Sequence, residues 1–333
     1  MHPIHERLRR LLCELGAAIR DGILEQRNRS GGADFANVAG AGGGDTIYQV
    51  DRVGEAAILA WFTRSWPSDL PVEIVMEGLT EPLAFPAGTA LSATDWKLLI
   101  DPVDGTRGLM VDKRSAWALA GVAPQNGSDT RLSEIVASAM TEIPVTKVWR
   151  ADQFSAVREG DVVGTSTDVR HGGPPESLFA SPSKAMSFEH GFASLVKFFP
   201  EGRTLTAQIE EQLWDELIGL GKHDSPVVFD DQYLSTGGQF HELLAGRDRM
   251  VGDLRPLVMR LLDMDTQLVC HPYDACAWLV LERAGVVFEH PLGGFPDAPM
   301  DTSSGIAWVA YANPHLAVLA RPVLQKILHR LRL

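Results

Sequence analysis

The chain has 333 residues, of which 45% are hydrophobic and 22% are charged, and its formal net charge is −13. This composition is typical of a globular protein and argues against global disorder. The acidic balance disfavours a role in coating nucleic acids. The length is sufficient for one large domain or for two packed subdomains, each with a core of its own.

Cysteine usage and hydropathy indicate the compartment. The three cysteines, Cys13, Cys270 and Cys276, form no regular framework, so we expect free thiols in a reducing environment. His271 lies between the last two, but the spacing fits no zinc motif, and buried core thiols are the preferred interpretation. Residues 1–10 lack the apolar run of a signal peptide, and no stretch reaches the ~20 apolar residues of a membrane span. We therefore predict a cytoplasmic protein.

Hydrophobic periodicity predicts the elements of the first half. Apolar residues between Leu8 and Ile23 recur at helical spacing and predict an opening amphipathic helix. Residues 30–45 are rich in glycine, and we expect a mobile loop without regular structure there. An extended piece over 46–50 then ends at Asp51, and a second helix follows around 56–62. Strands are predicted at 72–76, 96–100, 117–122, 135–140 and 147–149, followed by an exposed connection over 160–182.

The second half contains more helical patterns than the first. Helices are predicted over 188–199, 205–220, 237–244, 254–262, 274–284 and 314–331, and short strands at 227–228, 286–289 and 306–310. We place the boundary between an N-terminal α+β subdomain, 1–183, and a C-terminal α/β subdomain, 184–333, after the exposed connection. This mixture of elements indicates a layered α/β or α+β fold class.

Two of the predicted strands end in acidic residues. Glu77 follows the strand over 72–76, and Asp101 follows the strand over 96–100. Sites in layered folds are commonly built at strand ends, so we expect both carboxylates to face one region. Asp274, at the start of a predicted helix, is a further acid far away in the chain.

The segment Asp101–Thr106 reads Asp-Pro-Val-Asp-Gly-Thr. Proline would stiffen a turn between the two aspartates, and glycine would give the backbone freedom after them. Such a turn could aim both carboxylates and the Val103 carbonyl at one side, where a hard cation such as Mg²⁺ finds oxygen ligands. N–H groups at Thr106 would suit a phosphate oxygen. When residues 101–105 are considered alone, an ordinary surface turn explains their sequence about equally well.

This segment resembles the metal-binding signature of the inositol monophosphatase family, part of a sugar-phosphatase superfamily that also contains fructose-1,6-bisphosphatase. The residues Tyr273-Asp274-Ala275-Cys276-Ala277, followed by 281–285, are similar to the late signature of the family, in which an aspartate opens a helix. The order of the parts also matches over nearly the whole chain. The resemblance implies the layered α-β-α-β-α sandwich of the inositol monophosphatase type.

The resemblance further implies a phosphoric monoester hydrolase that uses Mg²⁺. Two or three Mg²⁺ ions would be held by Glu77, Asp101, the Val103 carbonyl, Asp104 and Asp274. Glu77, Thr106 and Asp51 would orient or activate the attacking water, without a covalent enzyme intermediate. Four acids crowded together without metal would repel one another, so metal binding should order the site.

Substrate contacts are implied at a further set of positions. The set comprises Gly105, Thr106, Ser235, Thr236, Gly237, Gly238, Gln267 and His271. An ordinary helix cap explains residues 235–238 about equally well, and a structural histidine is a slightly better interpretation of His271. Gln267 stands where the family has a carboxylate that contacts a sugar hydroxyl. The substrate would be a small phosphorylated metabolite: inositol phosphate, another sugar phosphate, histidinol phosphate and a 3′-phosphonucleotide all stay open.

The sequence departs from the family pattern at three places. Met76-Glu77-Gly78 lacks the second acid of the usual Gly-Glu-Glu, the glycine-rich segment offers no lysine before Asp51, and Tyr273 replaces a tryptophan. These departures motivate a second hypothesis, a non-catalytic member of the family that binds a phosphorylated ligand or a partner protein. A third hypothesis, a sugar bisphosphatase, requires an extra basic cluster. The resemblance also allows a homodimer.

Overall fold

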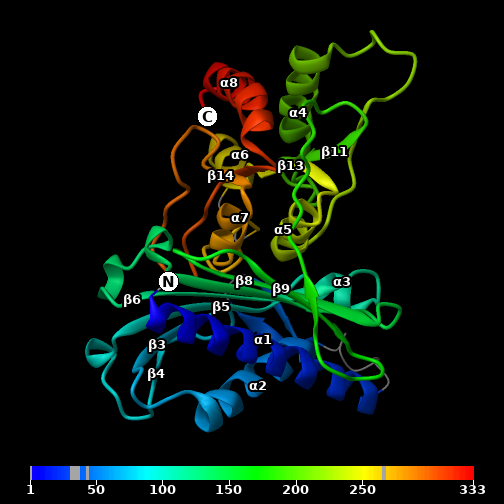
Figure 1. Cartoon of the computed structure of the whole chain (residues 1–333). Coiled ribbons are helices and arrows are strands. Elements are labelled where there is room, and N and C mark those ends of the chain that lie inside the picture. Colours follow the sequence, from blue (N-terminus) through cyan, green and yellow to red (C-terminus); the bar gives the residue numbers. More distant parts are fainter. Residues whose placement is uncertain (1, 31–37, 43–44, 265–267) are drawn as a thin grey trace.

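The computed structural model describes residues 2–30, 38–42, 45–264 and 268–333. Two large sheets and three groups of helices are stacked in five layers (Figure 1). Helices α1 (Pro3–Ser30) and α2 (Gln49–Ser65) cover the outer face of an eight-stranded sheet, and α5 (Thr236–Leu244) and α7 (Trp278–Ala284) lie between this sheet and a five-stranded one. The predicted layered α-β-α-β-α sandwich is confirmed.

The eight-stranded sheet provides the floor of the site. Its neighbouring strands are antiparallel except for β3 and β5, which run parallel. In spatial order the strands are β10 (Glu176–Leu178), β9 (Val163–Asp168), β8 (Arg150–Val157), β7 (Ala137–Ile143), β6 (Ala116–Pro124), β5 (Trp96–Asp104), β3 (Val72–Met76) and β4 (Leu83–Phe85).

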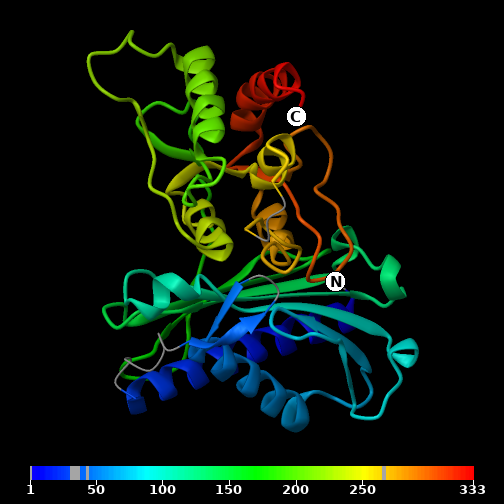
Figure 2. The same cartoon turned by 180° about the vertical axis from the view of Figure 1, so that it is seen from behind.

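Helix α1 lies against this sheet because its apolar stripe is continuous. Leu8, Leu12 and Leu15 are completely buried, and further apolar residues follow on the same face. Gly16 brings the helix close to β7, since a side chain at this position would collide with Thr141. Helix α2 packs beside α1, and the ribbon of β1 (Val38–Gly42) and β2 (Asp45–Tyr48) packs beside α2 (Figure 2).

The five-stranded sheet is mixed and carries the outermost helices. Strand β11 runs parallel to β12 and β13, whereas β15 is antiparallel to β13 and β14. Helices α4 and α8 pack on each other and on β11 and β15 respectively. The elements are β12 (Val228–Phe229), β11 (Gly191–Leu195), β13 (Asp248–Asp253), β15 (Trp308–Tyr311), β14 (Val287–Glu289), α4 (Arg203–Ile218), α6 (Arg255–Leu261) and α8 (Pro314–Arg330).

Buried apolar side chains form two clusters, one on each face of the large sheet. One lies between this sheet and the α1 and α2 helices, and the other fills the space around α5, α7 and the five-stranded sheet. Strand β5 contributes to both, because Leu98 and Ile100 face the first cluster and Leu99 faces the second. Both sides of this strand are therefore buried, which explains its nearly continuous apolar sequence.

Several predicted elements were wrong. The segment 188–199 is not a helix, because Gly191–Leu195 forms β11 between two parallel neighbours. The exposed connection over 160–182 contains β9 and β10, and the expected loop over 30–45 contains β1. The predicted strand at 147–149 lies before β8, and β13 was not predicted. The boundary between subdomains 1–183 and 184–333 stays a prediction. In the described residues no helix is long and apolar enough to cross a membrane.

Candidate metal centre

A β-bulge in β5 directs two aspartates to the same face of the large sheet. Asp101 pairs with Leu119 and Asp104 pairs with Trp117, so that β5 has one residue more than β6 in this interval. In a regular strand, residues three apart point to opposite faces. The extra residue of a bulge changes this alternation, and bulges are common beside active sites. The predicted turn at residues 101–104 is thus a bulged strand.

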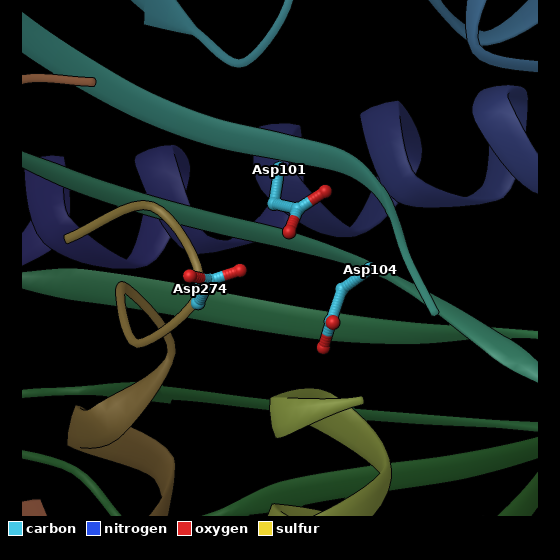
Figure 3. Close-up of side chains that lie close together, drawn as sticks. All are labelled: Asp101, Asp104 and Asp274. Carbon is cyan, nitrogen blue, oxygen red and sulfur yellow. The ribbon is translucent and has the colours of Figure 1, made fainter. Parts of the chain in front are cut away.

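Asp274 joins these two aspartates from a distant part of the chain (Figure 3). It lies in a series of turns before α7, which begins at Trp278 rather than at Asp274 as expected. One carboxylate oxygen from each of Asp101, Asp104 and Asp274 can be chosen so that all three lie within 4.8 Å of one another. Asp101 and Asp104 are buried and Asp274 is half-buried. The structure therefore brings together three of the acids proposed as metal ligands.

The N-terminus of α5 holds Asp104. The Ser235 hydroxyl and the Gly237 N–H donate hydrogen bonds to Asp104 Oδ2 over 2.9 and 2.5 Å. Ser235 is also the N-cap of α5, because its Oγ accepts a hydrogen bond from the Gly238 N–H over 2.9 Å. The expected helix cap at 235–238 is confirmed, and these residues orient an aspartate of the site.

Glycines allow α5 and the bulge to approach each other. Gly105 has φ of 98°, and a Cβ there would lie 2.9 Å from Ser235 Cβ. A Cβ at Gly237 would lie 2.6 Å from Trp117 Cβ on β6. Both positions therefore exclude a larger side chain for steric reasons. The role of these glycines in substrate binding stays a prediction.

Asp274 is held by the backbone that precedes it. The His271 N–H donates a hydrogen bond to Asp274 Oδ2 over 2.6 Å. The His271 ring is buried, lies 2.8 Å from the Ser304 carbonyl through Nδ1, and stacks on Tyr273 at a centroid distance of 5.2 Å. These contacts agree with the structural interpretation of His271. Gly121 on β6 permits the approach of this turn, since a Cβ there would lie 2.5 Å from the Cys276 carbonyl.

A buried ion pair beside Asp274 was not predicted. Arg255 donates to Asp253 through Nε over 2.9 Å, and its Nη1 donates to the Leu268 carbonyl over 3.1 Å. The positive charge of Arg255 acts to lower the pKa of Asp274. Asp253 and Arg255 are two residues apart, a spacing that is also common for charges on a protein surface. Only the burial of both side chains in the fold marks them as part of the site.

Burial and mutual repulsion shift the titration of the three aspartates. Burial, and then the charges of Glu77 and the other aspartates, raise the pKa of Asp101 well above its ordinary value. Burial and the charge of Asp274 raise the pKa of Asp104 to about 7, although hydrogen bonds from α5 oppose the shift. Burial raises the pKa of Asp274 to about 6. A cation would relieve the cost of ionising these groups together.

The donor set fits a hard cation. All the groups that meet here are carboxylate oxygens, which Mg²⁺ prefers over nitrogen and sulfur ligands. Cys270 and Cys276 are buried and contribute no atom to this cluster, and burial raises the pKa of both thiols. The interpretation of these two cysteines as buried thiols is confirmed.

Glu77 lies at the margin of the cluster. It follows β3, is half-buried, and its N–H donates to the Ile100 carbonyl of β5 over 3.2 Å. It is not one of the three grouped carboxylates, although its charge contributes to the raised pKa of Asp101. Glu77 therefore lies within electrostatic reach of Asp101.

Of the remaining predicted residues, the structure describes some fully and others only in part or not at all. Thr106 begins the short helix α3 (Thr106–Met110), and its hydroxyl donates to the Val103 carbonyl over 2.8 Å. Asp51 lies within α2, which begins at Gln49 and so earlier than expected. The side chain of Asp51 and all of Gln267 lie outside the described residues.

A separate cavity of about 840 Å³ lies beside α5 and is lined by charged groups, among them Glu142, Asp152 and His241. His241 Nε2 lies 3.1 Å from Asp152 Oδ2. Burial acts to lower the pKa of His241, but the hydrogen bond to Asp152 and the carboxylate of Glu242, 3.7 Å from Nδ1, outweigh it and raise this pKa to about 9. None of the three grouped aspartates lines this cavity.

Comparison with known proteins shows the fold. No family model and no curated protein sequence matches the chain. Among solved structures, it is similar to fructose-1,6-bisphosphatase from Leishmania major (14% identity, TM-score 0.67, 96% of this chain and 94% of that one). It is also similar to the extragenic suppressor protein SuhB from Bartonella henselae (15%, 0.64, 96% and 99%) and to an inositol monophosphatase from Zymomonas mobilis (15%, 0.55, 98% and 99%). The chain thus has the inositol monophosphatase fold.

Proposed function

We propose that the protein is an Mg²⁺-dependent phosphomonoesterase that hydrolyses a small phosphorylated metabolite. The observation that carries this proposal is the meeting of Asp101, Asp104 and Asp274 within 4.8 Å on a largely buried face. Two of them come from one bulged strand, and the third comes from a turn about 170 residues later in the chain. Solved proteins with the same fold are described as fructose-1,6-bisphosphatase and inositol monophosphatase.

The chain offers residues for each part of such a reaction. Asp101, Asp104 and Asp274, with Glu77 and the Val103 carbonyl, would hold two or three Mg²⁺ ions. Bound Mg²⁺ would neutralise charge on the phosphate and lower the pKa of water. Thr106, whose hydroxyl contacts the Val103 carbonyl, and Asp51 would orient the attacking water beside Glu77.

Substrate selection would depend on the surrounding small and polar groups. Residues 105–106 and the N-terminal turn of α5 lie beside Asp104, and His271 lies beside Asp274. We infer from this proximity that these positions would contact a phosphate monoester held at the aspartates. The identity of the alcohol that carries the phosphate stays open among the compounds named above. The homodimer and the cytoplasmic location stay predictions.

The test is a phosphatase assay over a panel of inositol, sugar, histidinol and nucleoside 3′-phosphates, with and without Mg²⁺. We expect phosphate release from at least one compound only when Mg²⁺ is present, and a loss of at least about 100-fold in the double variant Asp101→Asn/Asp104→Asn. Asp129→Asn, at an exposed acid, is the matched control and should keep full activity.

Full activity in the double variant would refute this mechanism. Tight binding of a phosphorylated compound in calorimetry, with no turnover over hours, would instead favour the non-catalytic binding protein.

A further inference from the structure

Gly78 leaves a space at the end of β3 that a carboxylate from another element fills. Gly78 follows Glu77 directly and has φ of 85°, so it has no side chain to offer beside this acid. A Cβ at position 78 would lie only 2.6 Å from Glu55 Oε1. The carboxylate of Glu55 thus lies where the side chain of residue 78 would begin.

Close packing of α2 on the bulged strand brings Glu55 to this place. The preceding residue, Gly54, is buried, and a Cβ there would lie 3.3 Å from both Pro102 Cβ and Val103 Cγ2. Helix α2 therefore contacts the segment between Asp101 and Asp104 directly. Glu55 lies one residue further along the helix and reaches the end of β3.

Glu77 lies between the residue that Glu55 approaches and the strand that carries Asp101. The Glu77 N–H donates a hydrogen bond over 3.2 Å to the carbonyl of Ile100, the residue that directly precedes Asp101. Glu55 contacts the residue that follows Glu77. A cation held by Glu77 would attract a second carboxylate placed beside it.

We propose that Glu55 provides the second carboxylate at the end of β3, in place of the acid that Gly78 cannot supply. It acts as a positioning residue that supports Glu77 and the Mg²⁺ held there. This inference rests on the metal-binding part of the proposed function. Groups that orient a metal ligand commonly change metal affinity by about 10- to 100-fold when they are removed.

Calorimetric titration of the purified protein with MgCl₂ tests the role of Glu55. We expect Glu55→Gln to weaken Mg²⁺ binding by about 10- to 100-fold at one class of sites, and Glu55→Asp to recover part of the loss because it keeps the charge. The matched control Glu14→Gln, at an exposed acid of α1, should bind as the unmodified protein does. Unchanged Mg²⁺ affinity in Glu55→Gln would overturn the proposal.

A second pair of variants separates the carboxylate from general damage to the site. Gly78→Ala puts a methyl group against Glu55 Oε1 and should also weaken Mg²⁺ binding, whereas the same change in a Glu55→Ala background should weaken it no further. The backbone strain at position 78 is common to both backgrounds, and denaturant unfolding confirms that each variant is folded. Equal losses in both backgrounds would contradict the proposal.

The readout also distinguishes this proposal from the proposed function. Mg²⁺ binding is measured without any phosphate ester, so a protein that binds Mg²⁺ but hydrolyses nothing in the panel refutes only the phosphatase. The Glu55 variants are then still decisive. A wild-type protein that does not bind Mg²⁺ at millimolar concentration would overturn both proposals.

Discussion

Ser235 Oγ lies 2.9 Å from Asp104 Oδ2 and donates a hydrogen bond to it, while the same oxygen atom of Ser235 accepts the Gly238 N–H. One hydroxyl thus caps α5 and orients an aspartate of the candidate metal centre. Helix stability and the geometry of the site are coupled through it. The coupling can be measured, because a different N-cap in the same chain has no contact with the site.

Ser235→Ala removes both hydrogen bonds of this hydroxyl. We expect a loss of about 1–2 kcal/mol in the free energy of unfolding and a loss of about 10-fold in Mg²⁺ affinity. Asn313→Ala is the matched control, because Asn313 caps α8 by accepting the Leu316 N–H. This control also removes the hydrogen bonds from Asn313 Nδ2 to the Ser183 and Ala185 carbonyls, so it should lower stability at least as much and leave Mg²⁺ affinity unchanged. Equal Mg²⁺ affinity in the two variants would contradict the coupling.

Gly105→Ala combines backbone strain with a collision against Ser235. We expect it to destabilise the protein by about 1 kcal/mol for the positive φ alone, and further for the contact at 2.9 Å from Ser235 Cβ. Gly88→Ala measures the strain by itself, since Gly88 has φ of 86° with open space around its Cβ position. The prediction fails if denaturant unfolding gives equal losses for both variants.

The three aspartates predict an unusual pH dependence in the absence of metal. Their folded-state pKa values, about 7 for Asp104 and about 6 for Asp274, exceed the ordinary 3.8. Their contribution to stability is therefore complete below about pH 4 and is lost as the pH rises through 7. Urea unfolding from pH 4 to 8 should show this loss relative to Asp104→Asn, and saturating MgCl₂ should remove it.

Proton release provides an independent measurement of the same linkage. Mg²⁺ must displace protons from Asp101, Asp104 and Asp274 at pH 6, where burial keeps these groups partly protonated. The binding enthalpy measured at pH 6 should therefore depend on the ionisation enthalpy of the buffer. A binding enthalpy that is the same in all buffers would contradict the raised pKa values.

His241 predicts a loss of stability at alkaline pH. Burial acts to lower its pKa, but the hydrogen bond to Asp152 and the nearby carboxylate of Glu242 raise it to about 9 in the folded protein, above the ordinary 6.5. Its contribution is complete below pH 6.5 and is lost as the pH rises through 9, by at most about 3 kcal/mol. The difference in unfolding free energy between wild type and His241→Asn should therefore decrease between pH 7 and 10. His315→Asn, at an exposed histidine, is the matched control.

Long periodic and continuously apolar segments made much of the fold predictable. The apolar stripe of α1 and the buried run of β5 specify their own structure, because each is long enough to show its period. Strand β11 was mistaken for a helix, since its five residues are decided by pairing with β12 and β13 rather than by local pattern. Strand β13 escaped prediction because aspartates stand at both of its ends.

In the candidate site, too, some residues could be predicted from the sequence and others could not. Residue types and spacing predicted that Asp101 and Asp104 face one side, and the resemblance to the inositol monophosphatase family implied that Asp274 joins them. The structure brings all three within 4.8 Å of one another, and their role as metal ligands stays a prediction. Sequence alone missed Arg255 and Glu55, because their positions depend on how α6 and α2 pack. Contacts between elements that are distant in the chain leave no local pattern, so only the folded structure reveals them.

The bulge in β5 makes chain length, and not only residue identity, a property of the site. Asp101 and Asp104 share a face because one surplus residue separates their partners on β6. Deleting one residue between them would leave the two carboxylates two residues apart and still on one face of a regular strand, but it would remove the local bend of the bulge that sets their relative directions. The number of residues between positions 101 and 104 therefore controls how the two carboxylates are aimed, even when neither acid is altered.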